Sequence, residues 1–250
     1  MRPPLRLAIL ECDTPLPNAD AKYGGYGGVF TTLLRSGAEL LGKPVLETVL
    51  QISKYQIQLD PDNYPKLEDV DAILLTGSRF NSFEDAPWIE KLVDFTAEIL
   101  KQDRIRLIGC CFGHQIIGRA MGVKVGRNEA GWEAAVDDVD LSERGKQLFG
   151  LEKLSIHQMH RDILRNYPDG VEQLGSSPVC PVQGMYKKGR LITVQGHPEF
   201  NEEITTELLR VRHTMGIFND DQFDKYMDKA GKPHDGVVVA RAFIEFLLDD

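Results

Sequence analysis

The sequence of 250 residues has no long apolar run, no excess of basic residues and few cysteines. No stretch approaches the roughly 18 to 20 consecutive apolar residues that a membrane-spanning helix needs. Lysine and arginine number 29 against 38 aspartates and glutamates, which gives a net charge of −9. Proteins that bind nucleic acid through phosphate contacts usually show the opposite balance or a basic block. We therefore expect neither a membrane nor a nucleic acid as a partner.

The four cysteines, two of them adjacent, do not form the pattern of a disulfide framework. The N-terminal apolar stretch Leu5–Leu10 is too short for a signal peptide, and Glu11 and Asp13 follow it. With 42% hydrophobic and 27% charged residues, the composition is that of an ordinary globular protein. These features predict a protein of a reducing compartment, and we expect it to be cytoplasmic.

Short aliphatic runs alternate with longer amphipathic stretches, which predicts an α/β fold with helices flanking a mostly parallel central sheet. The expected strands are Leu5–Leu10, Val45–Leu50, Asp71–Leu75 and Ile105–Gly109. The expected helices are Val29–Leu41, Pro87–Leu100 and, near the C-terminus, 202–216, 220–230 and 237–248. Residues 123–194 contain short β-like pieces and predict a small antiparallel section. We interpret residues 1–250 as one domain, with a core at about 5–215 and a helical C-terminal addition at about 216–250.

The segment Leu107–Gln115 has the layout of a nucleophile elbow. A strand ends, two glycines bracket three residues, and a helical pattern begins. Such a turn lifts its middle residue, here Cys111, above the sheet at a helix N-terminus, where the helix dipole favours the thiolate. Cys110 would point back along the buried strand. The alternative interpretation is that both cysteines are core residues at a strand end.

A thiolate nucleophile needs a proton carrier, and the carrier must be oriented. His197 directly follows the apolar strand Leu191–Val194. In extended backbone, residues i and i+2 face the same way, so His197 and Glu199 can point together, and Pro198 holds that geometry. A carboxylate beside an imidazole selects its tautomer and stabilises the imidazolium. His-Pro-Glu on its own is also typical of a polar strand end, but together with the cysteine turn it predicts a Cys-His-Glu site.

Two motifs in this order carry a family resemblance. Gly109–Gln115, followed 86 residues after the cysteine by Gly196–Glu199, resembles the class I glutamine amidotransferase domain over roughly residues 5–215. The resemblance implies a flavodoxin-like α/β fold. It also implies a catalytic triad formed by Cys111, His197 and Glu199.

The resemblance further implies an oxyanion hole built from backbone N–H groups. One is the amide of Phe112, the residue after the nucleophile, and the other comes from an earlier glycine loop. For that loop we expect Ser78 to donate and Gly77 to permit the turn. The sequence Gly77-Ser78-Arg79 departs from the Gly-Gly-Pro of synthetase-linked members, but a backbone donor tolerates a side-chain change.

Three segments, Tyr23–Phe30, Thr76–Ile89 and Gln158–Asp162, resemble stand-alone members of the family, the γ-glutamyl peptidases and related fungal proteins. The resemblance implies a substrate pocket lined by Gln115, Tyr26, Met159 and His160. Two alternatives stay open: the glycine-rich segment is a flexible turn, and His160 is a local cap. Nucleotide binding does not fit, because Phe30 stands where a Gly-x-Gly-x-x-Gly pattern needs its last glycine.

Neither a synthetase domain nor an ATP-binding pattern accompanies these motifs. We therefore expect a cysteine-dependent hydrolase that cleaves the γ-glutamyl amide bond of a small molecule, such as glutamine, glutathione or a glutathione conjugate, through a glutamyl thioester. One alternative is a glutaminase subunit that delivers ammonia to a separate synthetase partner. Another is a non-catalytic binding or regulatory protein with the same fold. No metal or other cofactor is expected, because Cys110-Cys111 lacks Cys-x-x-Cys spacing and His157 and His160 lack obvious further ligands.

Overall fold

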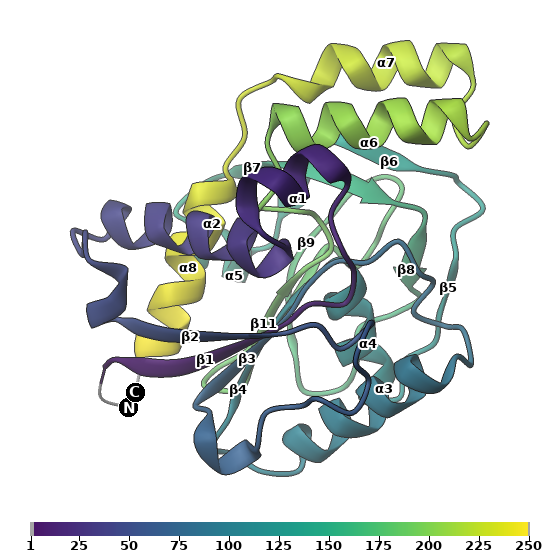
Figure 1. Cartoon of the computed structure of the whole chain (residues 1–250). Coiled ribbons are helices and arrows are strands. Elements are labelled where there is room, and N and C mark those ends of the chain that lie inside the picture. Colours follow the sequence, from purple (N-terminus) through teal and green to yellow (C-terminus); the bar gives the residue numbers. More distant parts are fainter. Residues whose placement is uncertain (1–2, 250) are drawn as a thin grey trace.

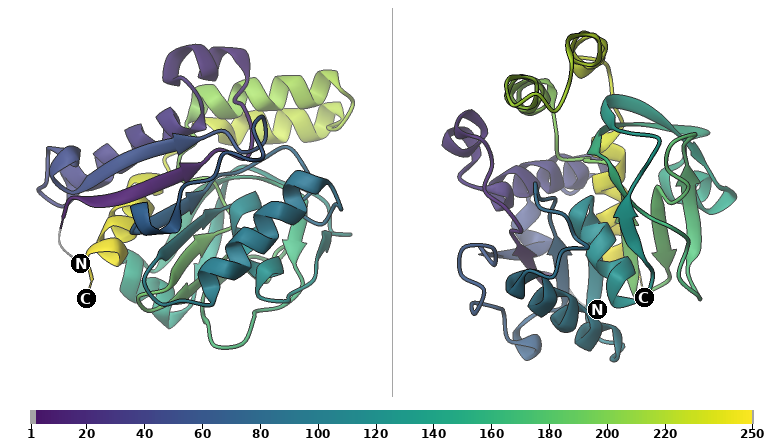
Figure 2. Two further views of the ribbon diagram at one scale, coloured as in Figure 1. Left: turned by 60° about the horizontal axis from the view of Figure 1, so that its bottom comes forward. Right: turned by 90° about the vertical axis from the view of Figure 1, so that its right-hand side faces the viewer.

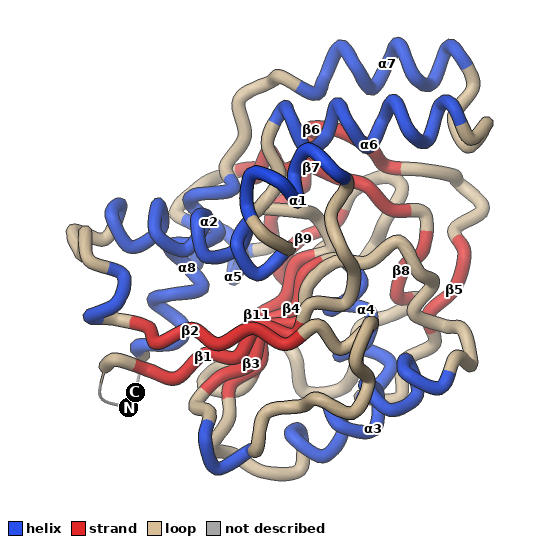
Figure 3. Tube along the Cα trace, in the orientation of Figure 1, coloured by secondary structure: helices blue, strands red, loops and turns tan. Residues whose placement is uncertain are grey.

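A nine-stranded β-sheet forms the centre of the computed structural model, which describes residues 3–249 (Figures 1 and 3). Its strands are β1 (Leu5–Leu10), β2 (Leu50–Tyr55), β3 (Ala72–Leu75), β4 (Arg106–Cys110), β6 (Glu133–Leu141), β7 (Lys153–His160), β9 (Glu172–Ser176), β10 (Gly184–Lys187) and β11 (Leu191–Val194). The order across the sheet is β2-β1-β3-β4-β11-β10-β9-β6-β7. The first five strands are parallel, in the flavodoxin-like arrangement, and the other four pair antiparallel. This confirms the predicted fold class, including the antiparallel section.

Helices cover both faces of the sheet and one of its edges (Figure 2). They are α1 (Pro17–Tyr23), α2 (Tyr26–Leu40), α3 (Pro87–Leu100), α4 (Phe112–Ala120), α5 (Glu143–Phe149), α6 (Glu202–Thr214), α7 (Asp220–Ala230) and α8 (Gly236–Leu248). Short 3-10 turns span Leu46–Thr48 and Leu67–Asp69, and a two-stranded sheet pairs β5 (Val125–Arg127) with β8 (Asp162–Leu164). Within residues 3–249, none of the helices has the length and apolar character needed to cross a membrane.

Strand β1 shows why the central strands consist of continuous apolar runs. Its side chains alternate between the two faces, and both faces are covered. Leu7 and Ile9 join a buried cluster with α2 and α8. Ala8 and Leu10 join a second cluster with α3 and α4. A third apolar cluster lies under the hairpin of α6 and α7, which stands at the top of Figure 1.

The prediction of a strand at Val45–Leu50 is wrong, because the strand begins five residues later. Residues 46–48 form a 3-10 turn, and the strand is Leu50–Tyr55. Leu46 and Val49 are buried because they close the end of the core beside α2. β2 is an edge strand with partly exposed polar residues, so it lacks the apolar pattern of its neighbours.

Helix α2 begins at Tyr26, three residues before the expected start, and the short helix α1 precedes it. Glycine has a low helix propensity, so the glycines in this segment did not indicate a helix. In the structure, Gly28 lies in the first turn of α2 and packs on the backbone of α1. A Cβ atom at Gly28 would lie 1.7 Å from the carbonyl oxygen of Tyr23. The glycine-rich segment is therefore a tightly packed helix junction and not a flexible turn.

Candidate active site

The loops after four neighbouring parallel strands meet at the carboxyl edge of the sheet. β1 leads to Asp13, β3 to Ser78, β4 to Cys111 and β11 to His197 (Figure 3). In open α/β sheets, ligands bind in the crevice at this edge. The position alone marks the four loops as a candidate site.

Cys111 occupies the strained turn between β4 and α4. Its φ of 49° and ψ of −105° place a non-glycine residue in a region that side chains rarely adopt. The turn requires a glycine at position 113, since a Cβ atom at Gly113 would lie 2.3 Å from the carbonyl oxygen of Leu75. Cys110 has the opposite setting, because it is fully buried in the apolar cluster beneath α2 and α8. Backbone strain of this kind persists only where the surroundings impose it, and it clusters at functional sites.

His197 is held from several sides. Its Nδ1 lies 2.8 Å from Oε1 of Glu199, whose side chain is fully buried. Its backbone N–H donates to the carbonyl oxygen of His157 on β7 over 2.7 Å. Its ring stacks on Phe200 with centroids 4.0 Å apart. The negative charge of Cys111 and a hydrogen bond with its side chain also act on the imidazole. The catalytic roles of the three residues stay a prediction.

The surroundings of His197 favour its charged form. Burial by itself lowers the pKa, but the negative charges of Cys111 and Glu199 and hydrogen bonds to both outweigh it and raise the pKa of His197 to about 10. His114, at the start of α4, behaves in the opposite way. Burial and the charge of His160 lower the pKa of His114 to about 3, and its Nδ1 pairs with the hydroxyl of Thr193. The imidazole of His197 therefore carries a positive charge at neutral pH, whereas the imidazole of His114 is neutral and has a structural role.

This arrangement predicts that Cys111→Ala lowers the pKa of His197. The substitution removes one negative charge and one hydrogen bond, while burial continues to disfavour the imidazolium. The measurement is an NMR titration of the protein labelled with ¹⁵N-histidine. Cys110→Ala is the matched control and should leave the pKa of His197 near that of the wild type. An unchanged His197 pKa in Cys111→Ala would contradict the ion pair.

The loop after β3 packs directly against the imidazole. A Cβ atom at Gly77 would lie 2.6 Å from Cε1 of His197. The φ of Gly77 lies outside the left-handed region, so it is this close approach that requires a glycine in the loop. Buried Asp13 anchors the loop by accepting hydrogen bonds from the guanidinium of Arg79 at 2.6 Å and from its backbone N–H at 2.8 Å.

Two adjoining cavities open at the site. The first, the cysteine chamber, has a volume of about 430 Å³, and its lining includes Cys111, Phe112, Gln115 and His160. The second, the histidine chamber, has a volume of about 250 Å³, and its lining includes Tyr26, His197, Phe200 and Met215. Residues that line both chambers are Ser78, Arg79, Met159, Arg212 and Ile217. The boundary between them therefore runs between the cysteine and the histidine.

The two amides expected in the oxyanion hole belong to residues that line the cysteine chamber. Phe112 begins α4, and Ser78 follows β3. Neither backbone N–H donates to an acceptor within residues 3–249. The oxyanion hole stays a prediction.

The predicted substrate-binding residues have different surroundings. Tyr26 and Met159 line the histidine chamber, as a pocket wall requires. Gln115 lines the cysteine chamber, but its amide is engaged within the protein: Oε1 accepts from Ser82, and Nε2 donates to the carbonyl oxygen of Asp162 and to Gln195. Gln115 thus connects three segments around the chamber.

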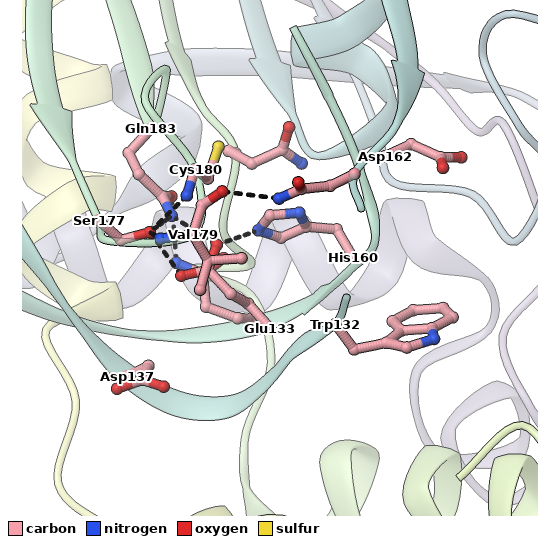
Figure 4. A network of polar contacts seen from close by, with 12 residues as sticks. Trp132, Glu133, Asp137, His160, Asp162, Ser177, Val179, Cys180 and Gln183 are labelled. Atoms are coloured by element: carbon pink, nitrogen blue, oxygen red, sulfur yellow. Dashed lines mark hydrogen bonds and ion pairs between the residues drawn. The ribbon is translucent and has the colours of Figure 1, made fainter. Parts of the chain in front are cut away.

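His160 belongs to a buried polar cluster with Glu133 and Cys180 (Figure 4). Its Nε2 lies 3.1 Å from Oε2 of Glu133. One potential metal-ligating atom from each of the three side chains lies within 4.8 Å of the other two. The expectation that His160 lacks possible metal ligands nearby is wrong, because folding brings together residues 20 and 27 positions away in the sequence. However, the Glu133 carboxylate already accepts hydrogen bonds from Ser177 at 2.6 Å and Gln183 at 3.1 Å. The absence of a metal stays a prediction.

Arg212 and Trp132 are lining residues that the sequence did not reveal. The guanidinium carbon of Arg212, in the last turn of α6, lies 4.6 Å from the centroid of the Trp132 ring. Arg210 lies two positions away on the same helix and is exposed outside both chambers. Nothing in the local sequence distinguishes these two arginines, because the packing of α6 decides which one enters the site.

Comparisons with known proteins identify the family of the chain. The family model for glutamine amidotransferase class I matches residues 31–212. A glutamine amidotransferase-like protein of Schizosaccharomyces pombe is 36% identical over 247 residues, 97% of this chain and 98% of its own. Gamma-glutamyl peptidase 2 of Arabidopsis thaliana is 28% identical over 231 residues, 91% of this chain and 89% of its own. A glutamine amidotransferase structure from Thermotoga maritima aligns with a TM-score of 0.69 at 16% identity, covering 98% of this chain and 99% of that one. With the family model covering most of the sequence, the chain belongs to the class I glutamine amidotransferase family.

Proposed function

We propose that this protein hydrolyses the γ-glutamyl amide bond of glutamine-like or γ-glutamyl peptide substrates. Cys111 is the nucleophile, His197 the proton carrier and Glu199 the group that orients it. The observation that carries the proposal is the strained Cys111 turn beside an imidazole whose pKa is raised. The similarity to a γ-glutamyl peptidase supports this substrate class.

The proposed reaction proceeds in two steps that use the same three residues. The Cys111 thiolate attacks the γ-carbonyl carbon, and the amides of Phe112 and Ser78 donate to the oxyanion. The C–N bond breaks as His197 gives its proton to the leaving nitrogen, which leaves a glutamyl thioester on Cys111. Water then attacks the thioester, His197 takes a proton from that water, and glutamate departs as the thiolate is restored.

The direct test is incubation of the purified protein with glutamine, glutathione and several γ-glutamyl dipeptides, with free glutamate as the readout. Hydroxylamine added to the reaction should intercept the thioester and yield γ-glutamyl hydroxamate. If no compound releases glutamate, the proposal fails in favour of a binding or regulatory role. Turnover of glutamine only in the presence of a synthetase would instead identify a glutaminase subunit.

Glu199→Gln is expected to lower kcat by roughly a hundredfold or more while leaving the melting temperature close to that of the wild type. Activity of the wild type should fall as the pH rises through about 10, where His197 loses its proton. The variant should lose activity at a lower pH, because the Glu199 charge helps to raise the pKa of His197. The measurement is a pH–rate profile. Glu203→Gln, on the exposed surface of α6, is the control; a Glu199→Gln profile that matches this control would contradict an orienting role.

A further inference from the structure

Arg212 is a cation without a carboxylate partner among residues 3–249, and it lies at the junction of the two chambers. Its guanidinium makes no ion pair or hydrogen bond with any group in residues 3–249, but it lies in close contact with the indole ring of Trp132. By contrast, Arg79 pairs with Asp13 and Arg127 with Asp162. The Arg212 side chain is partly buried. A partly buried guanidinium that no carboxylate of the protein pairs with can bind an anionic ligand.

The location of Arg212 indicates which part of a substrate carries that anion. Arg161 also makes no ion pair within residues 3–249, but it lines only the cysteine chamber. Arg212 lines the histidine chamber as well, so it faces the side from which His197 protonates the leaving nitrogen. In a γ-glutamyl dipeptide, the carbon attached to that nitrogen bears a carboxylate. This carboxylate would lie at the junction where Arg212 stands.

The rest of the histidine chamber is lined mainly by apolar side chains. These are Leu16, Tyr26, Phe200, Leu208, Val211 and Met215. Met215 is 68% exposed, so part of this apolar surface forms the rim of the chamber. Ammonia, the leaving group of glutamine, would leave a cavity of about 250 Å³ without an occupant. An apolar amino-acid side chain matches both the size and the chemistry of the lining.

We propose that the leaving-group site recognises an α-amino acid, with Arg212 binding its carboxylate and the histidine chamber taking an apolar side chain. This inference rests on the proposed function and narrows its substrates to γ-glutamyl dipeptides whose second residue is apolar. Arg212 then sets specificity and takes no part in the proton transfers.

The test compares γ-glutamyl-leucine with γ-glutamyl-3-methylbutylamide, which is the same molecule without the leaving-group carboxylate. Arg212→Gln should raise KM for γ-glutamyl-leucine by about 10- to 100-fold, the usual value of a charged hydrogen bond, and should barely change KM for the amide. Arg212→Lys should recover part of the loss. Arg210→Gln makes the same charge change on the exposed side of α6 and should match the wild type with both compounds.

A second measurement separates binding from turnover. Calorimetry compares the inactive variant Cys111→Ala with the double variant Cys111→Ala/Arg212→Gln. The double variant should bind γ-glutamyl-leucine more weakly and should bind the amide equally well.

The wild type should also prefer γ-glutamyl-leucine over γ-glutamyl-glycine by roughly tenfold or more in kcat/KM. Equal effects of Arg212→Gln on both compounds, or a preference for glycine, would overturn this inference while γ-glutamyl hydrolysis stands. No turnover of any γ-glutamyl compound would overturn the proposed function and the inference with it.

Discussion

Cys111→Ser is expected to abolish glutamate release, with a fall in kcat of at least about a thousandfold. A serine hydroxyl is a much weaker acid and a weaker nucleophile than a thiol. The strained turn and its contacts remain, because serine has nearly the size of cysteine. Steady-state kinetics with a γ-glutamyl dipeptide provides the measurement, and thermal unfolding verifies that the variant is folded.

The neighbouring cysteine provides a control one residue away. Cys110 is fully buried on the opposite side of the turn, and burial raises the pKa of its thiol well above the usual value. Cys110→Ser should therefore keep most of the activity, and any loss should follow a reduced stability from the buried hydroxyl. Equal loss of kcat in the two variants, with both folded, would mean that the turn does not select Cys111.

Gly77→Ala is expected to lower kcat by about a hundredfold without touching a triad residue. The added methyl group would lie 2.6 Å from Cε1 of His197, so the imidazole or the loop must move. Displacements of about 1 Å at a reacting group are known to cost roughly this factor. The kinetics should show a larger effect on kcat than on KM, because the added methyl group meets the imidazole of His197.

Gly126→Ala serves as the control for Gly77→Ala. A Cβ atom at Gly126 would lie 3.3 Å from the flexible end of Arg165, which can yield without backbone movement. This variant should retain near wild-type kinetics. If Gly77→Ala also retained them, the loop after β3 would not be holding His197, and the tight packing at this point would have no bearing on activity.

The meeting of Cys111 with His197 could be predicted because each lies directly after a parallel strand. Strands β4 and β11 are neighbours in the sheet, so residues that follow them converge although they are 86 positions apart in the sequence. Pro87–Leu100 was predictable for a local reason, since it has a proline in its first turn and one continuous apolar face.

Features that depend on packing between distant segments could not be predicted. The edge strand β2 carries polar residues, so its sequence lacks the apolar pattern that predicts a strand. The approach of Arg212 to the site follows from the docking of α6, and exposed Arg210 has the same local sequence signal. The cluster of Glu133, His160 and Cys180 likewise arises from contacts between separate strands and loops.

The hydrogen bond from the backbone of His197 to the carbonyl oxygen of His157 has a mechanical consequence. His157 lies on β7, and Met159, two residues further along the same strand, forms part of the boundary between the chambers. We therefore expect a ligand large enough to shift the strand at Met159 to shift the support of the imidazole as well. Under the proposed function, an oversized molecule would then be turned over more slowly as well as bound more weakly.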